Sequence, residues 1–127
     1  MIIVEFNEAS GILEAKFQDD VTLAEVIGYI DKTRRSKRYP RVLKILTDAT
    51  RAKMNFSASD LTAIVEANYH SLLKYEFIID AIVLDSPKET ALSVLYQELA
   101  KTQKYRFKVC STRKAALEWL DSNNYPQ

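Results

Sequence analysis

The segment Phe77–Leu84, FIIDAIVL, decides the fold that this sequence can adopt. It is apolar on both faces except for Asp80, as a central strand of a parallel sheet must be when helices cover both of its sides. The next residues, Ser86–Glu89, place serine at a helix cap, proline at the first helical position and glutamate at the third. A buried strand that leads directly into a helix indicates an α/β domain.

Toward the N-terminus, the periodicity predicts a β-hairpin and then a helix. Apolar residues alternate with others over residues 2–6 and 13–17, on either side of a turn-like cluster. Thr22 and Glu25 form a capping box, and apolar residues follow it at helical spacing. We expect this helix to end in the basic run Arg34–Arg38, where cations meet the helix dipole favourably. An anionic partner for that run is the alternative.

The rest of the chain repeats strands and helices. Residues 42–46 predict a strand, residues 48–55 a loop, and Ser57 the start of a second helix. Residues 105–109 predict the last strand, which a capped helix follows. The helix after Pro87 has a predicted buried stripe of Leu92, Leu95, Tyr96 and Leu99.

We therefore expect residues 1–127 to form one α/β domain in the order β-β-α-β-α-β-α-β-α. Its mixed, mostly parallel five-stranded sheet has an antiparallel edge, which the hairpin supplies. The residues predicted to be buried are Val4, Leu13, Ile27, Ile45, Leu46, Ile64, Ile82, Val83, Leu95, Phe107 and Leu117.

These connections have a consequence for the surface. Crossovers that progress in one direction place the helices mainly on one face of the sheet. Part of the other face then stays available for a weak two-fold homodimer. The hairpin residues expected to serve it are Ile2, Val4, Phe6 and Leu13.

Composition limits the possible partners. Hydrophobic residues make up 47% of the chain, which is enough for a core without disulfides or a structural metal. Eighteen basic and seventeen acidic residues nearly cancel, so the net charge does not support binding to nucleic acid. The single cysteine fits a reducing compartment, and no apolar run approaches the ~20 residues of a membrane span. We expect a cytoplasmic protein.

The residue types that carry chemistry are scarce. The sequence has no glycine-rich phosphate loop, and its lone histidine and lone cysteine, His70 and Cys110, are far apart. Cys110 precedes a helix start, where a reactive thiol is physically possible, although a small buried hydrophobic role is commoner. No nucleophile–base pair or carboxylate pair can be named. We therefore expect neither an enzyme, nor a cofactor, nor a metal.

Three parts of the chain carry a family resemblance. They are the hairpin with the helix from Thr22, the segment Val42–Ala49 (VLKILTDA), and the ending Phe107–Leu120 (FKVCSTRKAALEWL). Together they resemble the SpoIIAA-like or STAS family of anti-sigma-factor antagonists, in its bacterial STAS/SEC14-like branch. The resemblance implies a SpoIIAA-like fold and a non-catalytic regulatory or protein-interaction module with a protein partner. The SEC14-like branch suggests an alternative, a carrier or sensor of a small apolar, lipid-like ligand.

The sequence departs from that family at its phosphorylation site. The antagonists carry Asp-Ser-Ser-Gly at the start of the helix after the third strand, and the first serine accepts the phosphate. The matching stretch here is Ser57–Asp60, with Ala58 at the acceptor position. The phosphorylation switch is therefore not carried over, although a shift of one residue in the alignment would place Ser57 or Ser59 there.

The loop and helix start after the third strand form the predicted partner or anion surface. Its residues are Asp48, Thr50, Arg51, Lys53, Met54, Ser57 and Ser59, with Thr47 beside them. Free amides at a helix start attract anions, Arg51 and Lys53 would add to this, and Met54 suits an adaptable contact. The alternative is that Ser57 is an N-cap and that Asp60 already satisfies the amides.

The two functional alternatives differ in the interior that they require. An internal apolar cavity favours the carrier or sensor, whereas a closed core with a flat apolar patch favours the interaction module.

Overall fold

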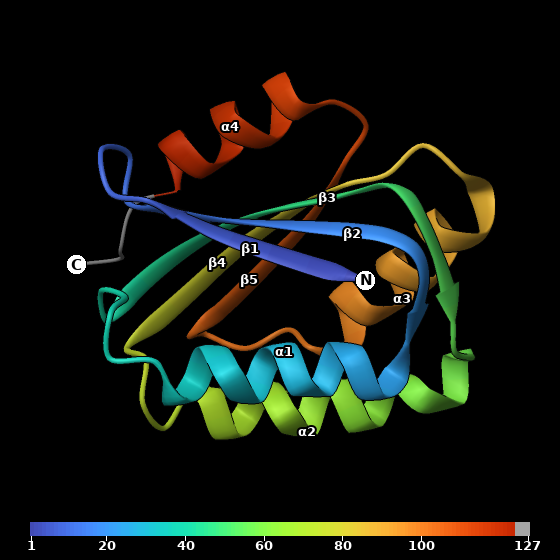
Figure 1. The fold of residues 1–127 in the computed structure, drawn as a ribbon, viewed down its shortest axis with the longest axis horizontal. Coiled ribbons are helices and arrows are strands. Elements are labelled where there is room, and N and C mark those ends of the chain that lie inside the picture. The colour runs from blue at the N-terminus through green and yellow to red at the C-terminus, as the bar shows by residue number, and fades with distance from the viewer. Residues whose placement is uncertain (124–127) are drawn as a thin grey trace.

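Helices pack on both faces of a five-stranded sheet in the computed structural model, which describes residues 1–123 (Figure 1). The elements are β1 (Ile2–Asn7), β2 (Ile12–Thr22), α1 (Leu23–Arg35), β3 (Val42–Asn55), η1 (Ala58–Asp60), α2 (Leu61–Ser71), β4 (Phe77–Val83), α3 (Pro87–Leu99), β5 (Tyr105–Cys110) and α4 (Arg113–Ser122). The predicted order of strands and helices is confirmed.

The strands lie side by side in chain order, β1-β2-β3-β4-β5. The β1–β2 pair is antiparallel and the other three pairs are parallel, so the predicted mixed sheet is also confirmed. Because the parallel connections all step in one direction, α1, α2 and α3 cover one face, called here the helical face, and α4 covers the other (Figure 1). β4 lies inside the sheet, and each of its residues except Asp80 is buried.

The predicted loop at residues 48–55 is wrong, because β3 continues as a strand to Asn55. After an irregularity between Lys16 and Gln18, β2 pairs with this extension up to Thr22. The polar side chains that suggested a loop alternate with buried Ala52 and Met54. In Figure 1 the ends of β2 and β3 bend toward α1 and α2 and so close one end of the layer between sheet and helices.

Most of the predicted core is buried. Leu13, Ile45, Leu46, Ile64, Ile82 and Val83 have at most 6% of their surface exposed. Ile27 and Phe107 are half-buried and pack against the main cluster on the helical face. A smaller cluster lies between the sheet and α4, and it includes Leu46, Ile79, Val83, Ala116 and Leu120.

Three core predictions are wrong, since Val4, Leu95 and Leu117 are 39%, 41% and 36% exposed. Val4 lies on β1, which is an edge strand. Leu117 lies on the outer side of α4, because Ala116 and Leu120 are the residues that face the sheet. Leu13 is fully buried, so it cannot join the homodimer surface expected on the hairpin.

The inward face of α3 differs from the predicted leucine stripe. Glu89, Ser93 and Tyr96 are buried, whereas Leu95 and Leu99 are exposed. Glu89 faces inward because its carboxylate accepts hydrogen bonds from Ser86 Oγ at 2.7 Å and from the Met54 amide at 3.1 Å. The third helix therefore turns polar groups toward the core.

No helix within residues 1–123 is long and apolar enough to span a membrane.

Candidate functional site

A cavity of about 90 Å³ lies in the layer between the helical face of the sheet and α1, α2 and α3. Its walls are mainly apolar side chains, among them Ile30, Ile45, Ile64, Ile78, Ile82 and Phe107. Met54, from the extended end of β3, also lines it. The core on this side of the sheet is therefore not closed, although protein interiors are ordinarily packed as densely as organic crystals.

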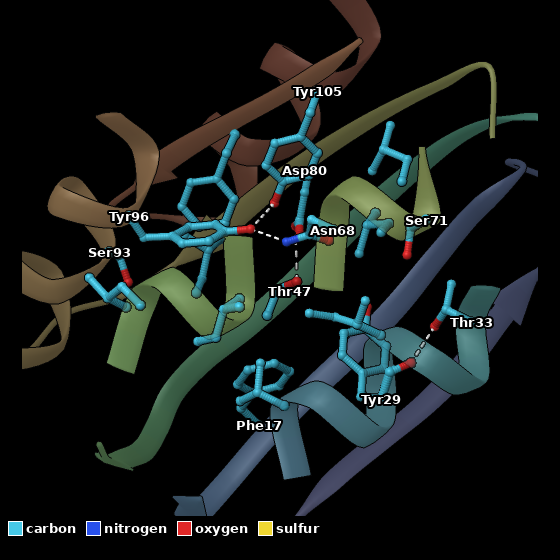
Figure 2. A pocket seen from close by; sticks show the side chains of 18 of the residues that line it. Phe17, Tyr29, Thr33, Thr47, Asn68, Ser71, Asp80, Ser93, Tyr96 and Tyr105 are labelled. Atoms are coloured by element: carbon cyan, nitrogen blue, oxygen red, sulfur yellow. Dashed lines mark hydrogen bonds between the residues drawn. The ribbon is translucent and has the colours of Figure 1, made fainter. Parts of the chain in front are cut away.

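Polar side chains from five elements meet in this apolar space (Figure 2). They are Thr47 of β3, Asn68 of α2, Asp80 of β4, Tyr96 of α3 and Tyr105 of β5. Thr47 Oγ1 donates a hydrogen bond to Asp80 Oδ1 at 3.0 Å. Asn68 Nδ2 donates to the Tyr96 hydroxyl, which in turn donates to the Tyr105 hydroxyl at 3.0 Å. These hydrogen bonds hold side chains from all five elements in place in the cavity wall.

Two groups in the cavity wall have spare hydrogen-bonding capacity. The Tyr29 hydroxyl is buried and has no hydrogen-bond partner within residues 1–123. The carboxylate of Asp80 has a single hydrogen bond, the one from Thr47, and no ion pair in that part of the chain involves it. The described lining of the cavity includes no lysine, arginine or histidine. Asp80 is half-buried, and an ionised carboxylate in mainly apolar surroundings without a counter-ion is costly, so the site disfavours the charged form of this side chain.

Burial controls the ionisation of these groups. It raises the pKa of the Asp80 carboxyl to about 7, although the hydrogen bond from Thr47 opposes the shift. Burial also raises the pKa values of Tyr29, Tyr96 and Tyr105, with the charge of Asp80 adding to each rise. The tyrosines are therefore neutral near pH 7, and the charge inside the cavity depends on Asp80.

The predicted partner or anion surface is divided by the structure. Asp48, Thr50, Arg51 and Lys53 lie on β3, where Asp48 Oδ1 accepts hydrogen bonds from the Thr50 amide at 3.1 Å and from its hydroxyl at 2.7 Å. Arg51 and Lys53 are exposed, as expected. The exposure predicted for Met54 and Thr47 is wrong, since they are 4% and 2% exposed and both face the cavity.

The two serines of that surface lie together at the short helix η1. Ser57 Oγ lies 2.8 Å from Ser59 Oγ and donates to Asp60 Oδ2 at 3.1 Å. The same Asp60 oxygen accepts a hydrogen bond from the Ser57 amide at 2.9 Å. This capping box is the alternative that the sequence left open, and it places a carboxylate where an anion would have to bind.

The lone histidine and the lone cysteine both lie outside the described lining of the cavity. His70 is exposed on α2, and residues 1–123 contain no cluster of three or more potential metal ligands. Cys110 is buried, and burial raises the pKa of its thiol, which is the opposite of activation.

Sequence reasoning missed the cavity, although one signal was present. Asp80 is the single charge within an otherwise apolar strand, and such a charge is buried when helices cover the face that it occupies. Its side chain points into the space beneath the helices, which four of the seven tyrosines of the sequence line.

Comparison with known proteins identifies the fold. No family model matches the sequence, and no curated protein does so. A solved structure is similar, that of an uncharacterised protein of the DUF3478 family with a SpoIIAA-like fold from Shewanella loihica PV-4, with a TM-score of 0.60. The similarity covers 94% of this chain and 92% of that one at 15% sequence identity.

The protein is thus an α/β domain of the SpoIIAA-like fold, as the sequence resemblance implied. Its particular feature is a cavity beneath the three helices of one face, with the half-buried Asp80 among its mainly apolar walls.

Proposed function

We propose that this domain is a non-catalytic carrier or sensor that binds a small molecule in the cavity beneath α1, α2 and α3. The observation that carries the proposal is a space between the sheet and three helices, with mainly apolar walls and a few polar groups whose hydrogen-bonding capacity is incompletely used. Ligand sites of proteins have this composition, with a few polar groups that orient the ligand.

The size of the cavity limits the ligand that fits without movement. An engineered cavity of about 150 Å³ in another protein binds benzene, so a space of about 90 Å³ accepts a group of roughly four or five heavy atoms. A larger ligand requires displacement of a wall. α3 is the wall at the side of the molecule (Figure 1), and it lines the cavity through Leu92, Ser93 and Tyr96.

The residues at the cavity support binding rather than catalysis. Asp80 is the single acidic residue of the described lining, which includes neither histidine, nor lysine, nor cysteine. A nucleophile needs a base within hydrogen-bond reach, and the tyrosines here are neutral and bonded to one another or buried. These features of the described lining support the proposal that the site holds a molecule without transforming it.

Filling the cavity should abolish ligand binding without unfolding the protein. Ser93 is 4% exposed and lines the cavity, so in Ser93→Leu the larger side chain enters the empty space. We expect native mass spectrometry of freshly purified wild-type protein to show an additional mass that denaturation removes, and that Ser93→Leu lacks. The matched control is Val94→Leu on the same helix, because Val94 is 47% exposed and should leave the bound mass unchanged. Equal bound mass in wild type and Ser93→Leu would contradict the proposal.

A regulatory protein-interaction module is the second candidate, and a specific observation favours it. Val94, Leu95 and Leu99 are 47%, 41% and 44% exposed on α3, and Arg51 and Lys53 are exposed on β3. Apolar and basic groups of this kind serve protein contacts.

The basic part of this surface has a direct test. Replacing Arg51 and Lys53 together with alanine should change the free energy of unfolding by no more than about 0.5 kcal/mol, because both side chains are exposed. If the surface binds a protein partner, the same double variant should lose that partner in a pull-down from cell lysate. If the double variant recovers the partner as well as the wild type does, Arg51 and Lys53 are not part of a protein-binding surface.

A further inference from the structure

We infer that the ligand of the cavity is a small organic cation, an ammonium group on a short apolar chain, which pairs with Asp80. This inference rests on the proposed function and adds the chemical class of the ligand. It follows from which charges the cavity contains and which it lacks.

The first argument is charge. Asp80 is a carboxylate in the apolar layer, and the cavity lining within residues 1–123 offers no cationic side chain to pair with it. An anionic ligand would be repelled by Asp80 and would find no positive group. A monocation would instead neutralise the carboxylate and remove the cost of its burial.

The second argument is the set of hydrogen-bond acceptors. An alkylammonium group has three N–H donors. The Asp80 carboxylate accepts one hydrogen bond, from Thr47, and the buried Tyr29 hydroxyl has no hydrogen-bond partner within residues 1–123. Both side chains line the same cavity, Asp80 from β4 and Tyr29 from α1. They therefore offer acceptors from two elements to a donor group held in that space.

The third argument is the aromatic wall. Phe17 and Tyr29 contact each other edge to face at 5.9 Å between ring centres on one side of the cavity. Tyr96 and Phe107 do the same at 4.8 Å, beside Tyr105. Ring faces attract cations, most strongly where water is excluded. The aliphatic residues between these rings would hold the apolar chain of the ligand.

The test compares three probes of similar shape and different charge: n-butylammonium chloride, n-butanol and sodium butyrate. Isothermal calorimetry at about pH 8 should show that butylammonium binds at least about tenfold more tightly than butanol, and that butyrate does not bind. An alkylammonium keeps its proton in this range, because the ordinary pKa of such a group is about 10.4.

The same titrations at about pH 6 test the role of Asp80. Its pKa of about 7 means that roughly nine-tenths of the carboxyl is ionised at about pH 8 and roughly one-tenth at about pH 6, so butylammonium should bind about tenfold more weakly at the lower pH. The other titratable groups of the described cavity lining are Tyr29 of α1, Tyr96 of α3, Tyr105 of β5 and Tyr75, which follows α2. Burial raises the pKa of each of these tyrosines, so all four stay neutral over this range and do not contribute to the change.

Two variants complete the test. Asp80→Asn keeps the shape of the side chain and should abolish both butylammonium binding and its pH dependence. Asp85→Asn, an exposed carboxylate just after β4, should bind as the wild type does. Butanol binding as tight as that of butylammonium, or an unchanged Kd in Asp80→Asn, would overturn the charge assignment and leave the cavity as a ligand site. Failure of all three probes to bind would overturn the proposed function as well.

Discussion

Replacing Asp80 with asparagine should raise the free energy of unfolding by roughly 2–4 kcal/mol at about pH 8 and leave it almost unchanged near pH 4. The pKa of Asp80 is raised to about 7 in the folded protein, from 3.8 in the unfolded chain. Between these values the folded state holds more protons than the unfolded state. The contribution of protonated Asp80 is therefore complete below about pH 4 and is lost as the pH rises through about 7. The asparagine side chain does not ionise in this pH range, so the stability of the variant does not fall as the pH rises through about 7.

Urea unfolding of both proteins across this pH range measures the difference. Asp85→Asn is the control, since this carboxylate is exposed, and it should keep the pH profile of the wild type. Parallel profiles for wild type and Asp80→Asn would show that Asp80 ionises in the fold as it does in the unfolded chain. The perturbed carboxyl group on which the charge assignment depends would then not exist.

Ile79→Ala should lower the free energy of unfolding by about 2–5 kcal/mol, the usual cost of deleting a large buried aliphatic side chain. Ile79 has 0% exposure and lies on the side of β4 opposite Asp80, in the cluster beneath α4. That cluster is filled by side chains and lies outside the cavity lining, so a ligand cannot relieve the loss.

The same urea experiment measures this loss, with Ile3→Ala as the control. Ile3 is 48% exposed on β1, and its removal should cost no more than about 0.5 kcal/mol. A cost below about 1 kcal/mol for Ile79→Ala would mean that the second face of the sheet is not a packed core.

The order of the elements could be predicted because its signals are local. The capping box at Thr22 is present, with Glu25 bonding back to the Thr22 amide, and α3 begins at Pro87 as the sequence indicated. The two-sided apolar pattern of Phe77–Val83 correctly placed β4 inside the sheet. Each of these features depends on residues that are neighbours in the sequence.

The long extension of β3 could not be predicted in the same way. The polar residues after Asp48 look like a loop, and they become a strand because β2 continues beside them up to Thr22. The irregularity between Lys16 and Gln18 shifts the register there. Pairing between segments that are distant in sequence therefore determines the secondary structure of residues 48–55. The same pairing places the Met54 side chain in the interior.

The cavity could not be predicted from the sequence for a related reason. A helical stripe of leucines on α3 is the simplest interpretation of the sequence, yet Tyr96 turns inward because Asn68 and Tyr105 provide hydrogen bonds for its hydroxyl. Those partners come from α2 and β5, and only the folded chain brings them together. The sequence shows Asp80 as a single charge in an apolar strand, but whether its side chain borders a cavity depends on how the helices pack over that strand.

The most direct test of ligand binding is a titration of the ¹⁵N-labelled protein followed by amide chemical shifts. n-Butylammonium and n-butanol are each added to tens of millimolar to the wild type, to Val94→Leu and to Ser93→Leu. We expect saturable shifts of the amides around the cavity in the first two proteins and none in Ser93→Leu, whose side chain fills the space. The absence of saturable shifts with both probes in the wild type, or equal shifts in Ser93→Leu, would contradict a ligand site beneath the three helices.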